Sequence, residues 1–326
     1  MNVGLKTPIL PAGEAAVAAA ARSLSQGGLV AFPTETVYGL GADATNPAAV
    51  ARIYQAKGRP AFNPLIAHVG DVAAARKIAR MDAHATALAE AFWPGPLTLV
   101  LPKTGDCAVA DLATAGLDTI AIRIPSHPVA RAILKSFGKP VVAPSANLSG
   151  HVSPTTAAHV RSDLDGRIDL IVDGGQTPVG VESTIVACLG EPVLLRPGGL
   201  PRAAIERALG RAVADPPPAH GGKGPIAPGM LASHYAPRTQ LRLNAHRIAP
   251  GEALLAFGPA PAEGAARAKC VLNLSARGDL VEAAANLFAH LRALDAAGAD
   301  AIAAMPVPHE GLGEAINDRL ARAAAR

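Results

Sequence analysis

Short apolar runs alternate with longer helix-forming stretches along the first two-thirds of the chain. Leu29–Phe32 is bounded by glycines and a proline, which is typical of a buried strand. In Thr119–Ile124 polar and apolar residues alternate, so its isoleucines are expected to face a core and Arg123 the opposite side. The same reasoning predicts strands at Leu65–Val69, Leu97–Leu101, Pro140–Ala143, Leu170–Val172, Ser183–Leu189 and Val193–Arg196.

Helices are predicted between these runs, and several of them begin at capping residues. Asn46-Pro47 is typical of an N-cap followed by proline at the first helical position, and it opens a helix to about Ala56. Ser153-Pro154 has the same form and predicts a helix to about Leu164. Further helices are expected over Glu14–Gln26, over Pro201–Leu209, and as a pair that begins at Asp71 as N-cap and ends near Ala91.

The pattern changes after residue 213. Residues 214–238 are rich in proline and glycine and predict a linker. The stretch Ala227–Pro237 has a more varied sequence than a passive linker would need. Beyond it, strands alternate with long helices, which predicts a small second α/β domain with a parallel sheet. The expected strands are Ala253–Phe257, Cys270–Leu274 and Ala301–Ala304, and the helices are Asp279–Ala297 and Gly313–Ala324. We therefore divide the chain into domains at 1–213 and 239–326, joined by the linker 214–238.

Composition narrows the class of function. Half of the 326 residues are hydrophobic and 17% are charged, so the chain can bury two cores. The net charge of +4 is compatible with phosphate-bearing ligands but is weak for a nucleic-acid surface, and only 3% of residues are aromatic. Three widely spaced cysteines favour a reducing cytoplasm over a disulfide framework. No apolar run approaches transmembrane length, so no membrane association is expected.

Hydroxyls, one amide-rich turn and cations gather at the predicted strand and helix ends. Walker A, Rossmann, HExxH and GxSxG patterns are absent, and no pair of carboxylates stands out as general acid and base. Such a set favours phosphoryl or nucleotidyl transfer between bound substrates, accelerated by positioning and charge neutralisation. The candidates are Thr36, Lys57, Arg59, Asn63, His68, Thr119, Arg123, Ser145, Ser153, Ser183 and Arg196.

Each of these candidates also has a simpler interpretation. Lys57 and Arg59 end a predicted helix, where cations commonly complement the macrodipole. Ser153 is explained fully by capping, and His68 in an apolar strand can be a satisfied core residue. Arg123 is either solvated or holding an anion. Residue chemistry alone leaves these alternatives open.

Several motifs together resemble the threonylcarbamoyl-AMP synthase family, and they occur in that family's order over nearly the whole chain. The linker Pro228-Gly229-Met230 with His234-Tyr235, and the C-terminal Asn317-Asp318-Arg319, resemble its long two-domain form. In the first domain the motifs are Pro33–Leu40, Lys57-Gly58-Arg59-Pro60, Asn63-Pro64-Leu65, Ile122-Arg123-Ile124-Pro125, Pro144-Ser145-Ala146-Asn147 and Glu182-Ser183-Thr184.

The resemblance implies a fold and a reaction. The first domain should be a twisted, open, mixed α/β sheet with a large concave face, of YrdC type, and the second a small Rossmann-like domain. The family makes threonylcarbamoyl-AMP from L-threonine, bicarbonate or CO₂, and ATP, with release of pyrophosphate. ATP would bind with Mg²⁺, and no dedicated protein site for the ion is evident. The product would pass to a complex that modifies tRNA next to the anticodon, with weak tRNA binding possible.

The resemblance also implies roles for individual residues. Lys57, Arg59 and Arg123 would be catalytic, and Tyr235 of the linker would close over the nucleotide as part of a lid. Threonine would be held by Thr36, His68, Arg123, Ala143 and Ser183. ATP would be held by Lys57, Arg59, Asn63, Thr119, Ser145, Ser153, Arg196 and Tyr235.

Two other functions fit a related fold. One is a non-enzymatic module that binds double-stranded RNA or tRNA, or that matures ribosomes, and the low aromatic content and weak charge count against it. The other is carbamoyl transfer from carbamoyl phosphate, for which zinc-knuckle cysteines and an acylphosphatase-like segment are expected but not found.

Overall fold

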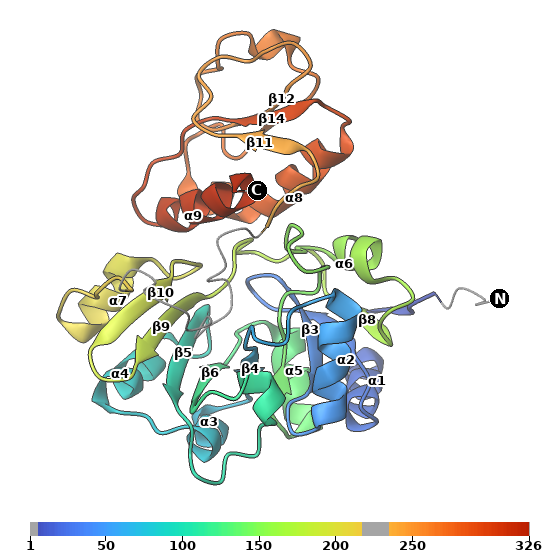
Figure 1. Cartoon of the computed structure of the whole chain (residues 1–326), viewed down its shortest axis with the longest axis vertical. Helices are drawn as coiled ribbons and strands as arrows, with labels where there is room; N and C mark the ends of the chain where they lie inside the picture. Colours follow the sequence, from blue (N-terminus) through green and yellow to red (C-terminus); the bar gives the residue numbers. More distant parts are fainter. Residues whose placement is uncertain (1–5, 217–234, 326) are drawn as a thin grey trace.

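The computed structural model describes residues 6–216 and 235–325, which form two domains, each built on its own sheet (Figure 1). In the first sheet the strand order is β1-β8-β2-β3-β7-β4-β6-β5-β9-β10, and the pairs are both parallel and antiparallel. This confirms the predicted open mixed sheet. Its strands are β1 (Ile9–Pro11), β2 (Val30–Pro33), β3 (Tyr38–Asp43), β4 (Ile66–His68), β5 (Leu97–Pro102), β6 (Thr119–Arg123), β7 (Val141–Val142), β8 (Leu170–Asp173), β9 (Thr184–Cys188) and β10 (Pro192–Arg196).

Capping residues start several helices of the first domain where the sequence predicts. The Asn46 side chain accepts hydrogen bonds from the backbone N–H groups of Ala48 and Ala49, and Asp71 accepts one from Ala74. The first of these helices ends at Gly58, whose φ of 59° lies in the left-handed region that glycine adopts readily. The helices are α1 (Glu14–Ser25), α2 (Pro47–Lys57), α3 (Val72–Ile78), α4 (Ala83–Phe92), α5 (Pro128–Phe137), α6 (Ala157–Leu164) and α7 (Arg202–Leu209), with a 3₁₀ turn η1 (Asp111–Thr114).

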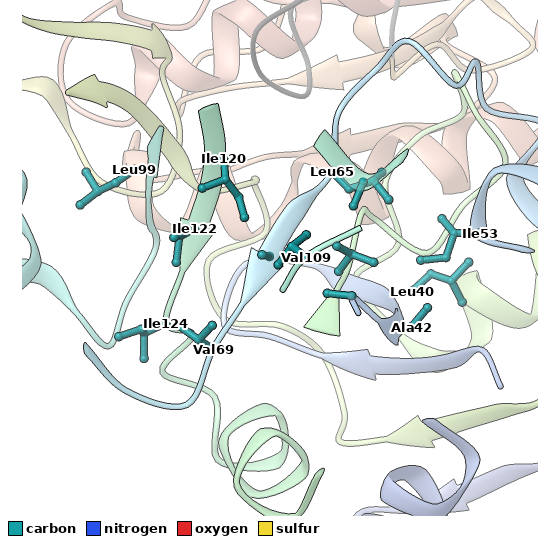
Figure 2. Packing of buried hydrophobic residues seen from close by; sticks show 14 of the residues in the cluster. Leu40, Ala42, Ile53, Leu65, Val69, Leu99, Val109, Ile120, Ile122 and Ile124 are labelled. Atoms are coloured by element: carbon teal, nitrogen blue, oxygen red, sulfur yellow. The ribbon is translucent and has the colours of Figure 1, made fainter. Parts of the chain in front are cut away.

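One face of the large sheet carries the main core. Ile120, Ile122 and Ile124 all point into this core, as their alternation in the sequence predicts (Figure 2). Buried residues of α2, α3, α4, α6 and α7 belong to the same cluster, so these helices cover this face. Arg123 is excluded from the core because its side chain projects from the other face of β6.

The opposite face is only partly covered. Helices α1 and α5 pack over β2, β7 and β8 through a second cluster that includes Phe32 and Val141. Further along the sheet, β4, β6, β5, β9 and β10 carry on this face a small apolar group that includes Ile66, Val100 and Ala121. This less covered end of the face is where the polar candidate residues gather.

The second domain is a four-stranded parallel sheet with order β11-β14-β12-β13. The alternation of strands and helices in the sequence predicted this sheet. The structure therefore confirms the small α/β domain. Helices α8 and α9 lie on the side that faces the first domain (Figure 1). The elements are β11 (Gln240–Arg242), β12 (Ala253–Ala256), β13 (Val271–Asn273), β14 (Ala301–Ala304), α8 (Leu280–Ala296), α9 (Gly313–Ala324) and a 3₁₀ turn η2 (Ala265–Arg267).

The fold differs from the sequence-based expectations at several places, among them helix α5, which was not predicted. The helix expected from Ser153 begins at Ala157, with Thr156 as its N-cap, so Ser153 is not a capping residue. Strand β3 was not predicted from the sequence. Gly41 is required there, since a Cβ would lie 2.6 Å from the ring of Phe32 on the neighbouring strand. The short edge strands β1 and β11 were not predicted.

None of the helices in the described part of the chain is long and apolar enough to cross a bilayer.

Candidate active site

A buried cavity of about 50 Å³ lies on the partly covered face of the large sheet. It is formed where β4, β6, β7 and β10 end and where the chain enters β3 and β9. Sequence analysis had proposed nine of its described lining residues as ligand contacts, although they come from distant segments. These nine are Thr36, Arg59, His68, Arg123, Ala143, Ser145, Ser183, Arg196 and Tyr235.

Strand register brings part of this set together. His68 pairs with Arg123 across β4 and β6, and Arg123 pairs with Thr98 across β6 and β5. Paired residues on adjacent strands project from the same face, so these three polar side chains form a row across the sheet. The hydroxyl of Thr98 lies 2.8 Å from that of Ser183, which extends the row to the start of β9.

Arg123 is held in place by three contacts. Its Nη2 donates to Glu35 Oε1 at 2.6 Å, its Nη1 to Thr36 Oγ1 at 2.9 Å, and its Nε to the Gly95 carbonyl at 3.3 Å. The other oxygen of Glu35 accepts from the backbone N–H of Ser126. Burial opposes ionisation of Glu35, but Arg123 outweighs it and the pKa of Glu35 lies below its usual range. A guanidinium has five N–H donors, so two of those on Arg123 remain for a ligand.

Lys57 is the last residue of α2 and Arg59 follows two residues later, and the two side chains have different structural roles. Arg59 lines it, and burial lowers its pKa to about 10, so it remains a cation at neutral pH. The Lys57 ammonium instead donates to the carbonyls of Ser145 and Asn147 at 2.6 and 2.5 Å. Lys57 therefore fixes the turn that presents Ser145 to the cavity.

Arg196 and Ser183 are joined by hydrogen bonds in the cavity lining. Nε and Nη2 of Arg196 donate to the Ser183 carbonyl at 3.2 and 2.9 Å, and Nη2 also donates to the Ser183 hydroxyl. Both residues are buried. Arg196 is thus a second guanidinium held in place in the cavity lining.

Glu182 and Glu35 were not among the predicted site residues. Glu182 lines the cavity, where its Oε1 accepts from the Ser153 hydroxyl at 2.5 Å. Burial opposes its ionisation, but Arg319 and Arg196 lower the pKa of Glu182 below its usual value. Each of these glutamates directly precedes a predicted hydroxyl ligand, Thr36 or Ser183. That adjacency was the signal available in the sequence.

Four predicted residues do not line the described part of the cavity. Lys57 lies behind the Ser145 turn, and the Ser153 hydroxyl donates to Glu182, which does line the cavity. The Asn63 carbonyl accepts from Arg59 Nε at 3.4 Å. Thr119 begins β6 and Arg123 ends it, so the two lie about 13 Å apart along an extended strand. The assignment of these four to ATP stays a prediction.

The predicted lid lies largely outside the described residues. Pro228-Gly229-Met230 and His234 fall in the segment 217–234, and only the end of the linker from Tyr235 onwards is described. Tyr235 itself lines the cavity and is buried. Its φ of 64° is in the left-handed region, which a large side chain rarely adopts.

Comparison with known proteins identifies the family. A family model described as "Telomere recombination" matches residues 22–198, and one described as "Threonylcarbamoyl-AMP synthase, C-terminal domain" matches residues 200–325. The threonylcarbamoyl-AMP synthase of Bacillus subtilis is 44% identical over 94% of this chain and 92% of its own length. The chain belongs to the threonylcarbamoyl-AMP synthase family. This confirms the resemblance drawn from the motifs.

Solved structures agree with this assignment. The crystal structure of Pyrococcus abyssi Sua5 in complex with L-threonine matches with a TM-score of 0.89 and 40% identity, covering 98% of this chain and 97% of that one. A shorter protein of the same family name, from Halorhodospira halophila, is 42% identical but matches only 48% of this chain. This chain therefore shares its two-domain architecture with the Pyrococcus abyssi protein. The Halorhodospira halophila protein does not match both domains.

Proposed function

We propose that this enzyme makes threonylcarbamoyl-AMP from L-threonine, bicarbonate or CO₂, and ATP, and releases pyrophosphate. The reaction is a nucleotidyl transfer. The observation that carries the proposal is the convergence of three buried guanidinium groups, Arg59, Arg123 and Arg196, with hydroxyls in one cavity. Such a cavity suits an amino-acid carboxylate and a triphosphate bound side by side.

The low pKa of His68 favours a direct reaction between the substrates. Burial, with Arg123 adding to it, lowers the pKa of His68 to about 3. His68 is then a neutral and very weak base, unsuited to removing a proton at neutral pH. Positioning of substrates and charge neutralisation remain as the sources of rate.

The threonine end of the site is assigned to Arg123 and its neighbours. The two remaining N–H groups of Arg123 would bind the threonine carboxylate, while Thr36 and Ser183 offer hydroxyls to its side chain. With its carboxylate fixed, threonine presents a neutral amine to CO₂. The amine nitrogen bonds to the carbon of CO₂ and releases a proton to water, which gives a carbamate.

The ATP end is assigned to other lining residues. Arg59, Arg196 and Ser145 line it, with Tyr235 beside them. A carbamate oxygen attacks the α-phosphorus, the bond to the bridging oxygen breaks, and pyrophosphate leaves with the negative charge that the two arginines offset. A cavity of about 50 Å³ is smaller than the few hundred Å³ typical of ligand sites, so we expect it to widen when ATP binds.

We further propose that ATP enters as its magnesium complex, in which the ion offsets charge on the phosphates. Among the described residues there is no group of three or more His, Cys, Asp or Glu side chains that could hold an ion. Glu35 and Glu182 are both paired to arginines. Phosphate oxygens and water would therefore supply the ligands, and no protein residue is assigned to the metal.

The product is a reactive mixed anhydride, so a transferase acting on tRNA must consume it promptly. We propose that the enzyme works in the cytoplasm and hands the adenylate to such a complex, with weak tRNA binding possible. All three cysteines are free, which supports a reducing compartment.

The test is pyrophosphate release from ATP, with threonine and bicarbonate omitted in turn. The proposal expects release only when both are present, together with one threonylcarbamoyl-AMP per pyrophosphate. Release that is indifferent to threonine would overturn it. Salt-sensitive tRNA binding without any consumption of ATP would favour the RNA-binding alternative.

A further inference from the structure

A fully buried arginine of the second domain reaches the active site of the first. Arg319 lies on α9, and its side chain is 0% exposed. Its Nε donates to Glu182 Oε2 at 2.7 Å, and its Nη2 donates to the Pro197 carbonyl at 3.0 Å. Its Nη1 donates to the neighbouring Asp318. A buried charge is costly unless it is paired, so this guanidinium is committed to these contacts.

The contact with Glu182 continues into the cavity. Glu182 lines the cavity and uses its two oxygens on opposite partners, Arg319 on one side and the Ser153 hydroxyl on the other. Ser183, the next residue, is held by Arg196. The carboxylate of Glu182 therefore joins α9 to Ser153, a predicted ATP contact, and lies next to the Ser183–Arg196 pair.

Arg319 also supports Tyr235. The centre of its guanidinium lies 5.0 Å from the centroid of the Tyr235 ring, within cation–π range. On the same ring Phe288 of α8 stacks with centroids 5.6 Å apart and planes 28° from parallel. The ring of Tyr235, whose backbone has the unusual φ of 64°, is thus packed against side chains of the second domain.

We propose that Arg319 is a positioning residue through which the second domain completes the ATP side of the active site, by fixing Glu182 and the ring of Tyr235. This inference rests on the proposed function for the identity of the ligand. It gives the second domain a part in substrate binding, whereas the alternative is that Arg319 merely joins the two domains.

Another ion pair on the same helix provides the matched control. Glu314 of α9 accepts from Arg202 of α7 at 2.7 Å, so it also joins the domains. Neither member of that pair lines the described cavity. Glu314→Gln therefore weakens the same interface without touching Glu182 or Tyr235.

The experiment compares Arg319→Met, Arg319→Lys and Glu314→Gln in the full chain. Titration calorimetry gives the Kd for ATP without turnover, steady-state assays give KM for ATP and for threonine, and thermal unfolding checks the fold. We expect Arg319→Met to raise the Kd and KM for ATP at least tenfold and to change the KM for threonine less than threefold. Glu314→Gln should stay within twofold of the wild type in every measurement.

Two further variants keep the inference testable if Arg319→Met folds poorly. Arg319→Lys keeps the charge near Glu182 but replaces a planar fork by a single ammonium, so it should recover only part of the ATP affinity. Glu182→Gln/Arg319→Met removes the unpaired carboxylate, so its Kd for ATP should be no higher than that of Arg319→Met alone.

The outcomes separate this inference from the proposed function. Equal ATP affinities for Arg319→Met and Glu314→Gln would overturn the inference, as would a Kd for ATP of Glu182→Gln/Arg319→Met above that of Arg319→Met alone. Failure of the wild type to release pyrophosphate in response to threonine would instead overturn the proposed function. The Kd values for ATP would still show whether Arg319 contributes to ATP binding.

Discussion

The two domains bury very different side chains. Among the described residues, twenty buried side chains of the first domain are polar or charged, against three in the second: Glu252, Ser275 and Arg319. Leu287, Phe288 and Ile302, by contrast, belong to the apolar cluster that forms most of the second domain's core. Both domains are α/β, so the fold class does not explain this difference.

Burying polar groups costs free energy unless each is paired, and a domain that carries many of them must have another use for them. In the first domain seven of the twenty line one cavity: Thr36, Arg59, His68, Arg123, Glu182, Ser183 and Arg196. In the second domain Arg319 is directed out of its own core and into that cavity's wall. The contrast teaches that the first domain provides the chemistry and the second provides a stable support with one projecting contact.

The largest expected effect concerns which amino acid the first domain accepts as substrate. If the polar cavity hydrogen-bonds the threonine hydroxyl, valine leaves buried polar groups unpaired, and kcat/KM for valine should fall by about 10⁴. Serine lacks only a methyl group, so its kcat/KM should fall by about 10- to 200-fold. Pyrophosphate release with each amino acid measures both, and equal use of valine and threonine would contradict this account.

Arg59→Ala tests the first domain directly. Losing one transition-state charge contact typically costs about 10²–10³ in kcat, so we expect a loss of that size with the fold unchanged by circular dichroism. Arg247→Ala is the control, since Arg247 lies in the second domain in an exposed pair with Glu263. Near-normal turnover of Arg59→Ala would remove that guanidinium from the mechanism.

His68 should make stability depend on pH. Its folded-state pKa of about 3 lies below the unfolded value near 6.5, because burial and Arg123 disfavour the charged ring. Below about pH 6.5 the unfolded chain binds a proton that the folded one does not, so stability falls with pH by up to about 1.4 kcal/mol per unit. Urea unfolding at pH 7 and pH 5 should show a smaller loss for His68→Gln than for the wild type.

His159, whose pKa burial and Arg292 lower to about 4, contributes equally to both proteins and cancels. Identical pH dependence in His68→Gln and the wild type would show that His68 is not buried as a neutral ring.

The smallest expected effect lies in the core of the second domain. Ile302 is fully buried there, and Ile302→Val removes one methylene without touching the cavity. We expect a loss of about 1 kcal/mol in the free energy of unfolding of that domain, with kcat and both KM values unchanged. A change in KM for ATP as large as that of Arg319→Met would mean that general stability, and not one contact, links the domains.

Local signals in the sequence predicted much of the fold. Caps at Asn46 and Asp71 start their helices as expected, and the isoleucines of β6 face the core. Prediction failed where tertiary contacts outweigh local preference. Ser153 has the form of an N-cap, but its hydroxyl donates to Glu182. The helix begins at Ala157, with Thr156 as its N-cap. The glycines of β3 break strand patterns, yet the close approach of Phe32 demands one.

The site was predictable where ligand contacts come from strand ends, since these converge in a sheet. Nine candidates therefore meet in the cavity. Charge pairing within the protein was not predictable. Arg123 is bonded to Glu35, 88 residues away, and Arg319 to Glu182, 137 residues away, and no spacing rule joins such partners. The part played by the second domain accordingly emerged only from the folded chain.

The central claim is that one cavity brings the amino acid and the nucleotide together. A crystal structure with L-threonine and an α,β-methylene analogue of ATP tests it most directly. The account predicts that Arg123 contacts the threonine carboxylate, that Arg59 and Arg196 contact the phosphates, and that the amine faces the α-phosphorus. Threonine and the nucleotide bound on separate surfaces, with Arg123 touching neither, would contradict it.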